Sequence, residues 1–167
     1  MAVNTTQETI NAIQEMVRES FLCNAKLDRL KSTLSVDWAY NNTANKIHLA
    51  ISHFFPIELG DALGDTSEGH NQSIIYGDIP IQNKTYSSVS EILNDLSETL
   101  IDYQNKLNMC AKISFDNMDL HVFSRMLPLI RKFDKIVEQS ILLVDKINLY
   151  GTDPSFDSNI ETFWLLW

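Results

Sequence analysis

Two histidines and three carboxylates fall within one short stretch of the sequence, residues 47–65. Glu58, Asp61 and Asp65 follow one another at i, i+3 and i+7, which places them along one face of an α-helix. A carboxylate row can bind a hard cation, or iron when histidine or water completes the shell. The stretch therefore predicts an iron site in which His53 supplies nitrogen, Asp65 supplies oxygen, and Asp61 or Glu58 assists.

The same stretch has a second interpretation. Acidic residues are usually exposed, so the row can equally be a solvated helix face. His48 falls on the apolar side of the helix, where a histidine packed in the core is commoner than a metal ligand. His53 lies at the boundary between the apolar and acidic stripes. A cation site and a solvated face both remain open.

The elements that must position these side chains are four long helices, predicted from apolar residues at three- and four-residue spacing. We expect them at about residues 6–33, 37–64, 88–111 and 117–150, within one domain covering 1–167. Ser87 to Glu91 supplies a capping box for the third helix, and Gly151 stops the fourth. The fold class is all-α, a four-helix bundle.

Two features modify this simple bundle. Pro56 lies inside the second helix, where the missing N–H and the ring predict a kink or a break. Residues 66–88 form a long crossover, and its apolar part, 74–81, should pack along the bundle as a short helix or an extended strip. A crossover of this length lets the third helix run parallel to the second.

The C-terminal tail, residues 151–167, is too apolar to remain exposed. It carries Phe156, Phe163, Trp164 and Trp167. An exposed patch of this kind would promote association. We expect the tail to dock on its own bundle or on a neighbouring subunit.

The composition limits the classes of partner. A formal net charge of −9 argues against direct nucleic-acid binding, which needs clustered lysine and arginine. No apolar run approaches the length of a membrane span, and no secretory signal is visible at the start, so we expect a cytoplasmic protein. Cys23 and Cys110 sit within apolar helical patterns and are expected to be free thiols.

The layout of a short first link, a long second link and a short third link is that of the ferritin-like fold. Within that class, three segments resemble the Dps family of small-shell ferritins: Trp38 to His48, Tyr-Gly-Asp-Ile-Pro at 76–80, and Thr85-Tyr-Ser-Ser-Val-Ser-Glu-Ile-Leu-Asn-Asp-Leu. The resemblance implies a homo-oligomeric shell, associated with stress response. Such a shell binds ferrous iron, oxidises it with peroxide or oxygen, and stores the product.

The chain departs from the motifs of both ferritin types. Ferritins proper carry inward glutamates with Glu-x-x-His pairs, and this sequence has no Glu-x-x-His. By periodicity four glutamates of the first and third helices point outward, so a di-iron site inside the bundle is not expected; they are Glu15, Glu19, Glu91 and Glu98.

The Dps family places iron between subunits, using first-helix histidines and an Asp-x-x-x-Glu on the second helix. This chain has no first-helix histidine, and Asp61 with Asp65 matches the carboxylate pair only in part. The implied ligands carried over are His53, Asp61 and Asp65.

Two functions follow from these observations. The first is iron binding, oxidation and storage in a homo-oligomer, with ferroxidase activity if the metal site is real. The second is a ferritin-like bundle without a metal site, acting as an interaction or structural protein through its tail and crossover.

Overall fold

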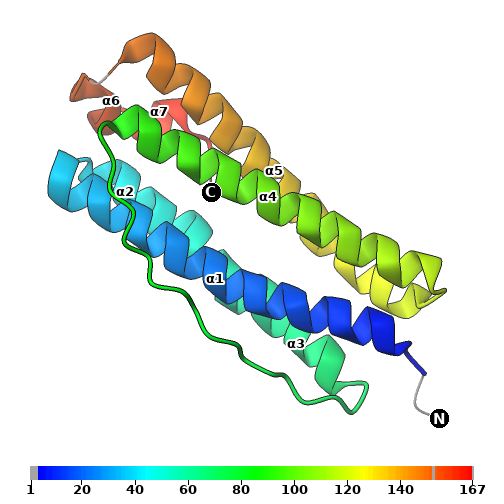
Figure 1. The fold of residues 1–167 in the computed structure, drawn as a ribbon. Coiled ribbons are helices and arrows are strands. Elements are labelled where there is room, and N and C mark those ends of the chain that lie inside the picture. Colours follow the sequence, from blue (N-terminus) through cyan, green and yellow to red (C-terminus); the bar gives the residue numbers. More distant parts are fainter. Residues whose placement is uncertain (1–3, 152, 167) are drawn as a thin grey trace.

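The computed structural model describes residues 4–151 and 153–166. In these residues four long helical segments pack side by side into an elongated bundle (Figure 1). The first is α1 (Gln7–Trp38), the third is α4 (Val89–Asp116) and the fourth is α5 (Leu120–Tyr150). The second consists of α2 (Asn41–Ile47), the π-helical turns η1 (His48–Ser52) and η2 (Phe55–Gly60), and α3 (Asp61–Glu68). The all-α four-helix bundle predicted from the sequence is confirmed.

Local sequence explains where the helices begin and end. The Thr6 hydroxyl accepts from the Thr9 N–H at the start of α1. Ser87, Ser88 and Glu91 form a variant of the predicted capping box: the Glu91 N–H donates to the Ser88 hydroxyl, and the Glu91 carboxylate accepts from the N–H of Ser87, one residue before the N-cap. Gly151, with a φ of 68°, ends α5 as predicted.

The link between the first and second helical segments is shorter than expected and lies later in the sequence. α1 continues to Trp38, five residues past the expected end at about residue 33, and α2 begins at Asn41 rather than at about 37. Ala39 reverses the chain in the left-handed conformation, with a φ of 57°. This single residue at the helix C-cap allows the tight link.

Pro56 neither breaks nor ends the second helical segment, because the backbone around it widens into π-helical turns. The N–H of Asp61 donates to the Pro56 carbonyl, and the N–H of His53 donates to the His48 carbonyl, both i to i−5. A proline removes one N–H and its ring crowds the carbonyl four residues earlier. The wider turn relieves that crowding, and π-bulges of this kind are frequent at functional sites.

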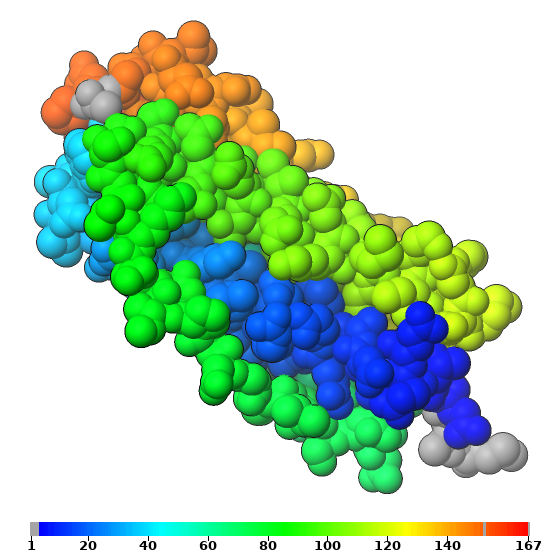
Figure 2. Space-filling model, viewed as in Figure 1, coloured from blue at the N-terminus to red at the C-terminus, as the bar shows by residue number. Residues whose placement is uncertain are grey.

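The crossover runs the length of the bundle as an extended strip over α1 and α3 (Figures 1 and 2). Gly64 permits this close approach, because a Cβ there would lie 2.6 Å from the Ile74 side chain. Tyr76 packs edge-on against Phe21, with ring centroids 5.5 Å apart. The predicted extended packing is confirmed for this part, whereas Ile75, Ile79 and Ile81 remain exposed. α4 consequently runs parallel to the second helix, as predicted (Figure 1).

The C-terminal tail docks on its own bundle, one of the two expected outcomes. It forms α6 (Ser155–Ser158) and α7 (Ile160–Phe163) and buries Phe156, Ile160, Trp164 and Leu166. Asp157 caps α2, because its carboxylate accepts from the N–H groups of Asn42 and Thr43 at 3.1 and 2.7 Å. Trp167 lies outside the described residues. Within the described ranges, no helix is both long enough and apolar enough to cross a membrane.

Asp119 fastens the start of α5 to the start of α1. Its buried carboxylate accepts from the Thr6 N–H at 3.2 Å and from the Thr6 hydroxyl at 2.7 Å. Burial alone would raise the pKa of Asp119, but hydrogen bonds from the cap threonines and nearby His121 bring that pKa below its ordinary value. A carboxylate with a lowered pKa stabilises the fold above its unfolded-state pKa and loses that effect as the pH falls.

Asp119→Asn should therefore lower the free energy of unfolding at pH 7 by about 1.5–3 kcal/mol, the range for a hydrogen bond to a charged group. Urea unfolding at several pH values measures the difference. The deficit should narrow as the pH falls below about 4, the ordinary pKa of an aspartate in the unfolded chain, and should disappear once the folded-state carboxylate, with its lower pKa, is also protonated. A deficit of equal size at pH 7 and pH 3 would contradict the charge-based explanation.

Candidate functional site

The predicted iron ligands lie along the second helical segment, but they are not gathered around one point. His53 is exposed between η1 and η2, and Asp61 and Asp65 are exposed on α3. Glu58 is half-buried and is committed to an ion pair with Lys132 of α5, whose Nζ lies 2.6 Å from its Oε1. The structure thus assigns Glu58 a bond across the bundle that the sequence did not indicate.

No group of three or more His, Cys, Asp or Glu side chains in the described residues is arranged to hold a metal ion. A site built on His53, Asp61 and Asp65 would need water or a second copy of the chain to complete its shell. The sequence argument assumed the 100° rotation of an α-helix, whereas residues 48–52 and 55–60 form π-helical turns, in which that rotation does not apply. The site remains a prediction.

His48 is held by polar contacts at the surface between α1 and η1. Its Nδ1 lies 2.9 Å from Lys31 Nζ and 3.7 Å from Asp28 Oδ1. Its ring packs edge-on against His53, with centroids 4.2 Å apart. The ammonium can only donate, so Nδ1 of His48 is the acceptor and the neutral ring carries its proton on Nε2. His48 is therefore satisfied, as expected, but it is half-buried rather than within the core.

The centre of the bundle is occupied by an aromatic cluster, which we define as Phe54, Phe55, Tyr103 and Phe133. The ring centroids of Phe55, Tyr103 and Phe133 lie 4.8–5.6 Å apart in edge-to-face contacts. All four side chains are buried. Di-iron bundles of this architecture project glutamates and histidines from all four helices into the same region. Here three of the four helical segments contribute aromatic rings instead.

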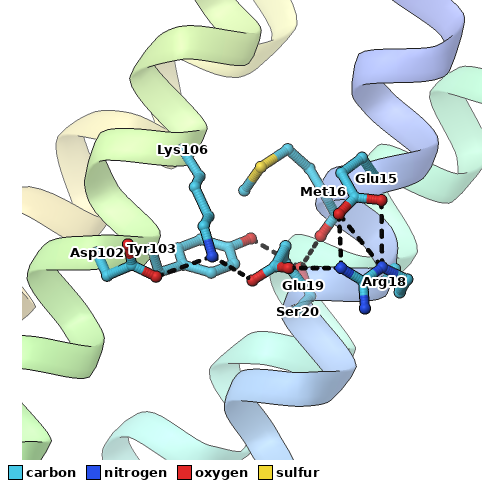
Figure 3. A network of polar contacts seen from close by, with 8 residues as sticks. All are labelled: Glu15, Met16, Arg18, Glu19, Ser20, Asp102, Tyr103 and Lys106. Carbon is cyan, nitrogen blue, oxygen red and sulfur yellow. Dashed lines mark hydrogen bonds and ion pairs between the residues drawn. The ribbon is translucent and has the colours of Figure 1, made fainter. Parts of the chain in front are cut away.

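A polar network lies beside the aromatic cluster, between α1 and α4 (Figure 3). The Ser20 hydroxyl donates to the Met16 carbonyl at 2.7 Å, so the Tyr103 hydroxyl donates to Ser20, also at 2.7 Å. Burial holds the pKa of Tyr103 far above its usual range. Tyr103 is therefore a neutral phenol whose ring fills part of the centre of the bundle.

Glu19 is the buried acid of this network. Its side chain lies between Arg18 and Lys106, with nitrogen to oxygen distances of 2.9 Å to each (Figure 3). Hydrogen bonds from Lys106 to Asp102 and Glu19 raise the pKa of that ammonium. Glu19 is only 5% exposed, so the expectation that it points outward is wrong. α1 packs against both the second helical segment and α4, which makes its buried arc wider than one apolar stripe.

These residues do not fit an iron pair inside the bundle. Both oxygens of Glu19 already face cations, which a bound metal would have to displace. Cys23 and Cys110 are also buried, and burial raises the pKa of each thiol to about 12. Thiols with such pKa values are protonated at neutral pH and are poor ligands. The described interior offers no carboxylate and histidine set for ferroxidase chemistry.

Comparison with known proteins identifies the fold. The chain matches no protein-family model and no curated protein sequence. Its structure is similar to that of M. penetrans ferritin, with a TM-score of 0.82 and 14% identity over 94% of this chain and 95% of that one. It is equally similar to a PmFTN variant soaked in iron, with a TM-score of 0.83 and 14% identity over 94% of this chain and 99% of that one.

Proposed function

We propose, on the premise that the chain has the ferritin fold, that it is an iron-binding subunit of a homo-oligomeric storage assembly. In this proposal iron binds at the exposed face of α3, not between the four helices. One observation supports this location of the iron site. The aromatic cluster fills the centre of the bundle, whereas Asp61 and Asp65 are exposed on α3, one turn apart. Neither carboxylate has a side-chain partner among the described residues.

The exposed pair has the chemistry that iron requires. Two carboxylates at i and i+4 stand on adjacent turns of one helix face, so one hydrated cation can contact both. Ferrous iron accepts oxygen ligands, and an imidazole such as His53 adds nitrogen. The net charge of −9 raises the local concentration of cations around the protein. Iron enters this scheme as the cargo.

A second copy of the chain is the natural partner for this face. Leu49 and Ile57 flank His53 at intervals of four residues, and each is 60% exposed. Exposed apolar side chains of this size favour association. An antiparallel interface with two-fold symmetry would set His53 of one copy against Asp61 and Asp65 of the other and complete a shell that one copy leaves open. Any ferroxidase activity would then belong to the interface, as in the Dps-type arrangement.

Asp61→Asn with Asp65→Asn should abolish most iron binding. The amides keep the shape but remove both charges, so ferrous iron affinity should fall at least tenfold, or about 1.4 kcal/mol. Anaerobic Fe²⁺ titration and iron retained after aerobic loading give the measurement. Asp37→Asn with Glu98→Gln is the matched control, since it removes two exposed charges from other helices. Unchanged iron uptake in the α3 variant would refute the site.

The second candidate function is a ferritin-like interaction or structural module without metal. The exposed Ile75, Ile79 and Ile81 of the crossover favour it, because they form an apolar strip along the bundle. Native mass and metal content of the wild-type chain separate the two functions. An assembly that retains no iron would support the module, and an assembly that retains many irons per subunit would support storage. The Dps-type, stress-response and cytoplasmic assignments remain predictions within the first function.

A further inference from the structure

Two histidines that lie far apart in the sequence meet at one end of the bundle. His70 follows the end of α3, and His121 lies in the first turn of α5. Their Nε2 atoms are 3.0 Å apart, and their ring centroids are 5.0 Å apart. The chain has four histidines, and the other two, His48 and His53, pack together on the second helical segment.

The tautomer of His70 is fixed by its second ring nitrogen. Nδ1 of His70 lies 2.6 Å from the carbonyl oxygen of Thr66, one turn earlier on α3. A carbonyl only accepts, so Nδ1 carries the proton and donates it. The neutral ring of His70 therefore presents an unprotonated Nε2 toward His121. Metal-binding histidines typically use this arrangement, with one nitrogen bonded to a carbonyl and the other free for the metal.

A third donor atom lies beside Nε2 of His121. The Thr5 hydroxyl oxygen lies 3.0 Å from Nε2 of His121. Imidazole nitrogens bind zinc at about 2.0–2.1 Å, so two of them at a right or tetrahedral angle stand about 3.0–3.4 Å apart. The observed 3.0 Å separation lies at the lower end of that range. The surroundings are half-buried, which leaves room for water ligands.

We propose that His70 and His121 form a binding site for a borderline divalent transition metal, of which Zn²⁺ and Co²⁺ are the practical probes. Nε2 of each ring binds the metal, and the Thr5 hydroxyl and water complete the shell. Without metal, Nε2–H of His121 donates to Nε2 of His70. When the metal binds, His121 carries its proton on Nδ1, so both rings stay neutral. Imidazole ligands favour Zn²⁺, Co²⁺, Ni²⁺ or Cu²⁺ over Mg²⁺ and Ca²⁺.

This site is independent of the proposed iron face and has a structural consequence of its own. It joins three segments that are distant in the sequence: the residues before α1, the end of α3 and the start of α5. The same end of the bundle is fastened by Asp119 and Thr6. A metal that binds only the folded state raises its stability by mass action.

The test uses the full chain stripped of metal by a chelator and titrated with Zn²⁺ or Co²⁺. Zn²⁺ should raise the midpoint of thermal unfolding, and Co²⁺ should give a visible absorption band, whereas Mg²⁺ should do neither. His70→Gln and His121→Gln should each weaken Zn²⁺ binding at least tenfold. His48→Gln removes an imidazole that belongs to neither proposed metal site and serves as the matched control. Zn²⁺ binding that survives both variants, or that never occurs, would overturn the proposal.

Nitrogen-15 spectra of the wild-type imidazole rings provide a readout that does not depend on how the variants fold. The Nε2 signals of His70 and His121 should shift on addition of Zn²⁺, while those of His48 and His53 stay in place. Shifts confined to His48 and His53 would place the metal elsewhere and refute the site. The Asp61→Asn, Asp65→Asn variant should bind Zn²⁺ normally, which separates failure here from failure of the iron proposal.

Discussion

Phe133→Ala is expected to lower the free energy of unfolding by about 3–5 kcal/mol, the range for truncating a buried phenylalanine. Phe133 is 1% exposed, and its ring contacts those of Phe54, Phe55 and Tyr103. Its removal would leave a cavity where three of the four helical segments meet. The surrounding rings are large and rigid, so the cavity cannot collapse without disturbing other contacts. Urea unfolding followed by circular dichroism measures the loss.

The matched control is Phe115→Ala. Phe115 lies near the end of α4 and is 51% exposed, so the same substitution should cost much less there. Comparable losses at the two positions would show that the aromatic cluster is not the centre of the core. Phe133→Ala should also leave iron binding unchanged, because the proposed iron face on α3 lies outside the cluster. If a folded Phe133→Ala variant also lost iron binding, iron binding would depend on the aromatic cluster.

Periodicity predicted the bundle because burial on one face dictates the spacing of apolar residues along a helix. α4 shows this most clearly, with Ile92, Leu96, Leu100, Tyr103 and Leu107 all buried. The capping box at Ser88 and Glu91 and the stop at Gly151 were also predictable, since both depend on local backbone chemistry. The parallel course of α4 followed from the length of the crossover.

The π-helical turns of the second segment were not predictable in this way. Pro56 indicated a disturbance, but it did not show whether the helix would kink, break or widen. The widened turns change the helical register between His53 and the two carboxylates, so α-helical spacing does not give their relative positions. α-Helical spacing therefore does not predict which side chains meet when a proline such as Pro56 lies between them.

Long-range partners were also missed, for a general reason. Buried Glu19 is paired with Lys106 of another helix at 2.9 Å, and the residues near Glu19 in the sequence do not indicate that lysine. His70 and His121 are separated by 51 residues and look like isolated polar residues in the sequence. Such pairs depend on which helices become neighbours. The aromatic cluster has the same origin, since its rings come from three separate segments.

Trp164→Ala is expected to release the C-terminal tail and to cost about 3 kcal/mol, the lower end of the range for a buried aromatic side chain. Trp164 is fully buried, and its indole nitrogen has no hydrogen-bond partner among the described residues. An unpaired buried donor is unfavourable, so its removal offsets part of the lost burial. Leu165→Ala is the control, because Leu165 is 70% exposed and should change stability by less than about 0.5 kcal/mol.

Limited proteolysis shows which part of the molecule Trp164→Ala disturbs. The tail also carries Asp157, which caps α2, and Glu161, which lies 2.5 Å from the buried Lys46. Its release would therefore leave the N–H groups of Asn42 and Thr43 without their acceptor and weaken the start of the second segment. We expect new cleavage near Gly151, followed by cleavage near α2, before the rest of the bundle is cut. Cleavage confined to the tail would mean that α2 does not depend on the Asp157 cap.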